Sequence, residues 1–108
     1  MKKILVKAWN NSAHHVSGAG YGIRISSHDI KEFDTLWDNI TIRIQDQPVF
    51  PARITNSFWN GKCHEIRSKK IGNWIISSGN RYWDNGNPPS FEFNQIEGNL
   101  FELKKLDQ

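Results

Sequence analysis

The chain has 108 residues, the size of one ordinary domain, and its 37% hydrophobic content includes six Phe, five Trp and two Tyr. This aromatic content argues against a disordered chain, and no run of residues approaches the roughly 20 apolar positions that a membrane span needs. A net charge of +3 and a single cysteine, Cys63, indicate a mildly basic protein without an internal disulfide, which we expect in the cytoplasm.

Alternation of apolar and polar residues predicts seven short strands separated by turn-rich segments. In chain order these strands lie at 2–9, 21–26, 39–45, 48–55, 63–67, 90–95 and 99–106. Pro48 and Pro51 indicate that the fourth strand lies at a sheet edge. Two polar loops, at 10–20 and 56–62, join the first strand to the second and the fourth to the fifth.

The first expected helix spans 28–37. Ser26 and Asp29 have the spacing that satisfies free N–H groups at a helix start, and Phe33 and Trp37 then fall on one helical face.

The second expected helix spans 68–78, with Ser68 as its N-cap and Gly79 at its C-terminal end. The element order β-β-α-β-β-β-α-β-β predicts one α+β domain, mostly β, over residues 1–108. Seven such strands close or nearly close into a barrel, because open sheet edges invite aggregation. The residues expected in its core are Ile23, Ile25, Phe33, Trp37, Ile42, Ile44, Ile71, Trp74, Ile75, Phe91 and Phe93.

Two local patterns accompany this order. The segment 20–26 leads from a glycine through a strand into the first helix, and the helical segment 71–79 is followed by the aromatic turn 83–86 and by 91–93 of the closing hairpin. In element order and in these patterns the chain resembles the DNA-binding pseudobarrel superfamily, from Lys2 to Leu106. That superfamily includes the plant B-three domains and the recognition domains of some restriction endonucleases.

The resemblance implies binding of double-stranded DNA, specific for a sequence or a modification, without a cofactor. Family members grip the major groove with two loops, which correspond here to 10–20 and 56–64. A protein of this kind is expected in a restriction–modification or mobile-element system of a bacterium or phage. One departure is that Asn87 follows Gly86, where the family usually has a Gly-Asp pair.

Both loops carry side chains suited to DNA, since Asn, Arg and Lys hydrogen-bond base edges and cations hold phosphates. The candidates in the first loop are Asn10, Asn11, Ser12, His14, His15 and Ser17. The candidates in and beside the second loop are Arg53, Asn56, Ser57, Trp59, Asn60, Lys62, His64, Arg67, Lys69 and Lys70. Asn and Ser are also ordinary loop residues, so the same composition describes a loop without a ligand.

Charge is distributed unevenly along the chain. Residues 53–70 hold five basic residues and one acid, whereas residues 84–102 hold four acids and no base. A surface polarised in this way attracts polyanions, although ordinary solvated charge is the alternative interpretation.

No catalytic or metal-binding motif emerges from the sequence. Cys63 and His64 are neighbours on a predicted strand and therefore point to opposite faces, which argues against a nucleophile–base pair. The histidines lack zinc-site spacing, and the acids are too scattered for a nuclease centre. We therefore expect neither catalytic residues nor a bound metal.

The pair Phe58–Trp59, inside a polar loop, suits stacking on a base, contact with a protein partner, or closure of one end of the barrel. Two other functions remain open. One is a protein-binding module, such as an inhibitor or immunity-type protein, that uses the same loops. The other is binding of single strands or RNA through exposed aromatic rings.

Overall fold

A curled sheet forms the framework of the chain. The computed structural model describes residues 3–60, 64–84 and 86–106, and within them seven strands pair in the order β4-β3-β7-β6-β1-β2-β5. The strands are β1 (Lys3–Asn10), β2 (Tyr21–Ile25), β3 (Asn39–Arg43), β4 (Phe50–Arg53), β5 (Glu65–Arg67), β6 (Ser90–Glu97) and β7 (Leu100–Lys105). The helical segments are the 3₁₀ turn η1 (Ile30–Glu32), α1 (Asn56–Trp59) and α2 (Lys69–Ser77).

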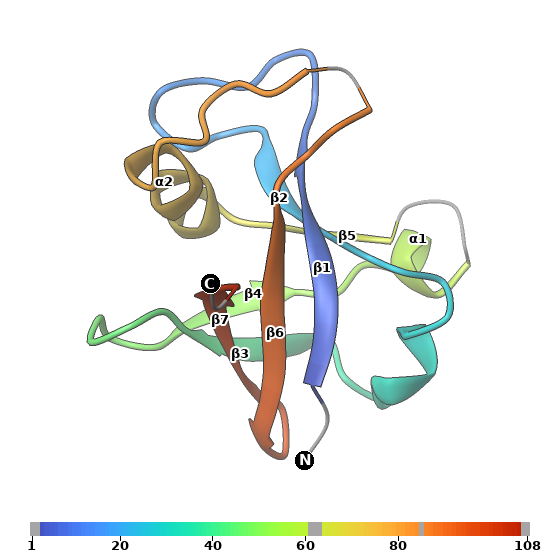
Figure 1. Cartoon of the computed structure of the whole chain (residues 1–108). Helices are drawn as coiled ribbons and strands as arrows, with labels where there is room; N and C mark the ends of the chain where they lie inside the picture. The colour runs from blue at the N-terminus through green and yellow to red at the C-terminus, as the bar shows by residue number, and fades with distance from the viewer. Residues whose placement is uncertain (1–2, 61–63, 85, 107–108) are drawn as a thin grey trace.

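The sheet closes almost completely, because its two terminal strands, β4 and β5, contact each other. Strands β3 and β7 pair in parallel and the other ladders are antiparallel. Figure 1 shows β1 and β6 crossing the hairpin of β3 and β4, with α2 on one side and α1 on the other. The predicted α+β, mostly β, open barrel is confirmed, as is the edge position of the strand that contains Pro51.

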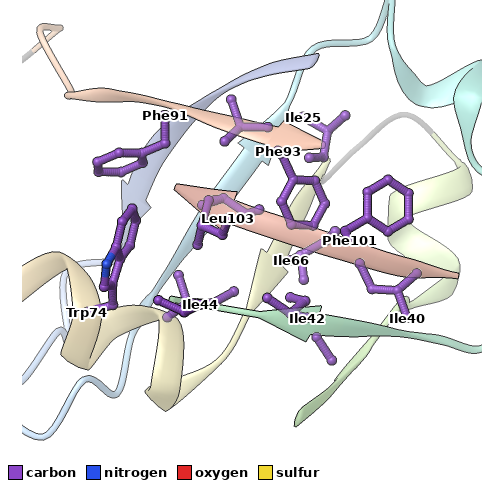
Figure 2. Packing of buried hydrophobic residues seen from close by; sticks show 14 of the residues in the cluster. Ile25, Ile40, Ile42, Ile44, Ile66, Trp74, Phe91, Phe93, Phe101 and Leu103 are labelled. Carbon is purple, nitrogen blue, oxygen red and sulfur yellow. The ribbon is translucent and has the colours of Figure 1, made fainter. Parts of the chain in front are cut away.

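Alternate residues of the strands fill the barrel. The Phe93 and Phe101 rings stack with centroids 4.8 Å apart, and Trp74 of α2 packs on Phe91 at 4.7 Å (Figure 2). Of the expected core residues, only Trp37 is not fully buried; it lies half-buried against the core. The expected core residues that are buried are Ile23, Ile25, Phe33, Ile42, Ile44, Ile71, Trp74, Ile75, Phe91 and Phe93.

The helix predicted over 28–37 is wrong. Its only helical part is the single turn Ile30–Glu32, and at Phe33 the backbone becomes extended (φ −102°, ψ 134°). The side chains of Ser26 and Asp34 each accept a hydrogen bond from the N–H two residues later, at 3.1 and 2.9 Å. Such local bonds give the backbone an alternative to helical hydrogen bonding, so Ser26, which predicted the helix start, instead forms a turn.

The apolar residues of this segment reach the core only in part, and without a helix. Phe33 enters the core and stacks on Phe101 with centroids 5.1 Å apart, and the half-buried Trp37 lies edge-on to Phe33 at 6.2 Å. Leu36, which also has helical spacing, is 85% exposed.

The predicted loop 56–62 begins with α1, a single helical turn that inserts Phe58 into the barrel end. Phe58 is fully buried, with its ring 5.4 Å from Phe33 and 5.0 Å from Trp59, which is half-buried. Of the roles considered for this aromatic pair, closure of the barrel end is the one that Phe58 performs.

Helix α2 confirms the second predicted helix and its caps. The Ser68 hydroxyl accepts a hydrogen bond from the Lys70 N–H at 3.1 Å, and Gly79 adopts a positive φ of 84° just beyond the helix. The loop between β1 and β2 folds onto this helix through Gly18 and Gly72. A Cβ on Gly72 would lie 2.2 Å from the carbonyl oxygen of Gly18, so neither backbone leaves room for a side chain.

We expect Gly72→Ala to destabilise the protein. Alanine normally stabilises a helix interior relative to glycine by about 1 kcal/mol, but here the added methyl meets backbone atoms. The expected net loss is about 1–3 kcal/mol in the free energy of unfolding, measured by urea denaturation. Lys69→Ala, at an exposed position of the same helix, is the control and should change stability by less than about 0.5 kcal/mol. A Gly72→Ala protein as stable as the wild type would contradict the packing of this loop on α2.

Candidate nucleic-acid interface

The outward side of β1, β2 and β5 gathers cations. In β1 the residues Ile4, Val6 and Ala8 point into the barrel, so the residues between them point outward. The residues of β2 and β5 that pair with these outward residues point the same way. We name this surface the cationic face; its members are Lys7, Trp9, Gly22, Arg24, Glu65 and Arg67.

The strand register arranges the cationic face in two rows. Lys7 pairs with Arg24, which pairs with Glu65. The adjacent row runs from Trp9 through Gly22 to Arg67. Residues that are distant in sequence therefore meet on one surface.

Glu65 is the anchor of this surface. Its side chain is only 4% exposed, and its Oε2 accepts a hydrogen bond from Nε of Arg24 at 3.0 Å and lies 2.9 Å from Nη2 of the same guanidinium. Its Oε1 lies 3.9 Å from Nη2 of Arg67. Both arginine side chains remain 57% exposed. One carboxylate thus orients two guanidinium groups and leaves them a joint charge of +1, from two cations and one anion.

Arg67 is also held by Trp9, because its guanidinium carbon lies 4.7 Å from the centroid of the indole. Gly22 separates the two residues in the row and places no side chain between them. A Cβ on Gly22 would lie 2.3 Å from the carbonyl oxygen of Ile66, so glycine also permits the close approach of β5. A cation–π contact at an exposed site contributes about 0.5–1 kcal/mol.

A hollow of about 250 Å³ lies where β4 meets β5, and we name it the seam hollow. Its lining residues are Arg53, Thr55, Ser57, Glu65 and Arg67. Arg53 and Thr55 also line an adjacent hollow of about 640 Å³, together with Asp38 and Asn56. The cationic face therefore continues across the seam to Arg53 and to the polar residues at the start of α1.

Several second-loop candidates meet the cationic face. Arg53, Ser57 and Arg67 line the seam hollow, Asn56 lines the adjacent one, and His64 lines a third hollow with Lys7 and Arg24.

Other candidates lie elsewhere. Asn60 is exposed at the end of α1, and Lys62 lies outside the described residues. Lys69 is exposed on α2, and the Lys70 Nζ lies 5.5 Å from the centroid of the Phe50 ring.

The first-loop candidates are engaged mainly within their own loop. The Asn11 Oδ1 accepts a hydrogen bond from the Ala13 N–H at 2.9 Å, and the His15 Nδ1 accepts one from the Ser17 N–H at 3.1 Å. Ser12 is exposed. Figure 1 shows this loop passing over α2, away from α1.

Two further first-loop candidates, Asn10 and His14, lie beside residues outside the loop. Asn10, at the end of β1, lines a hollow with Trp9 and Arg24. The His14 Nδ1 lies 3.2 Å from the hydroxyl of Tyr21, which donates to the carbonyl oxygen of Arg81 at 3.0 Å. Burial raises the pKa of Tyr21, so its hydroxyl stays protonated and available as a donor.

Sequence reasoning missed Lys7, Arg24 and the anchoring role of Glu65. Lys7 and Arg24 each occupy a polar position in an alternating strand, which was the available signal. Their meeting depends on the register between strands, which no local pattern reveals.

Metal-ligating residues do not converge in the described part of the chain: no three His, Cys, Asp or Glu side chains there form a group that could hold an ion. Cys63 lies outside the described residues. Among the described helices, none is long and apolar enough to cross a membrane.

Comparison with known proteins finds no matching family model, no matching curated protein and no matching solved structure.

Proposed function

We propose that this protein binds double-stranded DNA through the cationic face. The observation that carries the proposal is the meeting of Lys7, Arg24 and Arg67 on three adjacent strands, with Glu65 buried beneath the two arginines. Exposed Lys and Arg side chains neutralise phosphates and release counterions, which supplies much of the affinity of proteins for DNA. The acid beneath the arginines lowers their joint charge to +1, but it contacts both guanidinium groups and leaves both side chains 57% exposed.

The surroundings of the cationic face support the same proposal. Arg53 adds a cation on the far side of the seam hollow, and Asn56 and Ser57 add hydrogen-bonding side chains beside it. Asn10 lies at the opposite end of the face, near Trp9. Cations can hold the DNA backbone while these neutral polar groups reach base edges. Specificity for a sequence or a modification would arise from these neutral polar side chains.

A protein partner is the second candidate, and one observation favours it. Leu5 points outward from the same strand as Lys7, is 53% exposed, and lines a hollow of about 620 Å³ with Arg24. An acidic protein with an apolar side chain would fit this combination. In that case the inhibitor or immunity-type function would replace DNA binding on the same face.

The proposal predicts strong salt dependence of binding to duplex DNA. Neutralisation of about four phosphates gives a slope near −3.6 in a plot of log affinity against log salt concentration. Lys7→Ala and Arg24→Ala should each weaken binding to every duplex and flatten the slope by about 0.9 for each phosphate that is no longer neutralised. Fluorescence anisotropy with random duplexes at several salt concentrations measures both quantities.

Lys105→Ala is the matched control for this experiment. Lys105 is exposed on β7, which lies two positions from β1 in the strand order. It should retain the affinity and slope of the wild type. Dissociation constants weaker than about 10⁻⁴ M at low salt would be below ordinary non-specific binding and would favour the protein partner instead.

The anchoring role of Glu65 gives a second prediction. Loss of a negative charge ordinarily strengthens binding to a polyanion, but Glu65→Gln should weaken it about 3- to 10-fold, because Arg24 and Arg67 lose their fixed orientation. Glu92→Gln is the control, since Glu92 is also outward-facing and is 3.8 Å from Lys3. That variant should bind DNA as well as the wild type or better. Tighter binding by both variants would show that charge alone, without orientation, governs the face.

A further inference from the structure

We infer that Arg67 recognises guanine, an inference that rests on the proposed binding of double-stranded DNA. Its guanidinium carbon lies over the Trp9 indole, 4.7 Å from the ring centroid, and Nη2 lies 3.9 Å from Oε1 of Glu65. The side chain nevertheless remains 57% exposed. The guanidinium therefore lies between a carboxylate and an aromatic ring, while a large part of the side chain faces solvent.

Restraint of the guanidinium matters for a base and much less for a phosphate. A phosphate accepts hydrogen bonds from many directions, so a flexible lysine such as Lys7 is sufficient to hold it. Guanine presents the acceptors O6 and N7 side by side along the edge of a flat base in the major groove. An arginine that already has contacts on two sides forms two parallel hydrogen bonds to these acceptors with less further loss of side-chain freedom.

Arg67 is restrained in a different way from Arg24. Glu65 accepts a hydrogen bond from Nε of Arg24 at 3.0 Å, whereas Arg67 lies 3.9 Å from Glu65 and over an aromatic ring, in the row where Gly22 leaves space for that contact. Arg67 also borders the seam hollow beside Arg53 and Ser57. The expected division of roles is that Lys7 and Arg53 hold phosphates and position the groove, while Arg67 discriminates among bases.

The experiment begins with a duplex selected by the wild-type protein from a random pool. Each guanine of that duplex is then replaced in turn by 7-deazaguanine, which lacks the N7 acceptor. We expect one replacement to weaken wild-type binding about 5- to 10-fold, since it removes one of two hydrogen bonds. Arg67→Lys keeps the charge but not the planar fork, so for this variant the same replacement should change affinity less than about 2-fold.

Lys7→Ala is the control, and it should bind all duplexes more weakly while keeping the full sensitivity to 7-deazaguanine. Trp9→Leu should lose most of that sensitivity, because the guanidinium plane is no longer supported. Circular dichroism of each variant verifies folding.

The outcomes separate the inference from the proposed function. Absence of duplex binding would contradict both the recognition of guanine and the proposed binding of DNA. Tight binding in which Arg67→Lys keeps the sensitivity of the wild type, or in which no guanine is sensitive, would overturn the recognition of guanine. Binding of DNA through the cationic face would then still stand.

Discussion

Glu65 points outward from β5, yet its side chain is almost completely covered, because two arginines from neighbouring rows close over it. The carboxylate joins β2 to β5 through Arg24, at the end of the sheet where the barrel nearly closes. The Arg67 side chain is held between this carboxylate and Trp9. Removal of a single charge would therefore loosen two cations as well as a link between strands.

The proposed DNA site is formed by this anchored surface more than by the two loops at 10–20 and 56–64. The loop between β1 and β2 is packed against α2 through Gly18 and Gly72, and α1 is pinned by the buried Phe58. A rigid sheet surface with fixed guanidinium groups favours specificity, because less side-chain freedom is lost when a ligand binds.

Periodicity in the sequence predicted the strands well, because alternation of apolar and polar residues directly reflects which side of a sheet is buried. It failed at 28–37, where the spacing of Phe33 and Trp37 imitated a helix but the side chains of Ser26 and Asp34 formed turns. Helix α2 was predicted with its caps because Ser68 and Gly79 act locally. Elements were therefore predicted correctly where one local pattern dominated, and wrongly where side-chain hydrogen bonds competed with the helical pattern.

The candidate site could be predicted only in part, because it depends on contacts between strands that are distant in sequence. Composition drew attention to polar loops, and it identified Arg53 and Arg67, which do border the seam hollow. It missed Lys7 and Arg24, because their relation to Glu65 is created by pairing between distant strands. The need for glycine at position 22 could not be predicted either, because it arises from the carbonyl oxygen of Ile66 in a neighbouring strand.

Titration of the ¹⁵N-labelled protein with a short DNA duplex, followed by NMR, tests most directly whether the cationic face binds DNA. If it does, the amide signals of residues 5–9, 22–24 and 65–67 should shift together and saturate. The signals of the β3–β4 turn at 44–49 should stay in place. Shifts confined to α2 and the loop at 11–20, with the cationic face unchanged, would contradict binding at this surface.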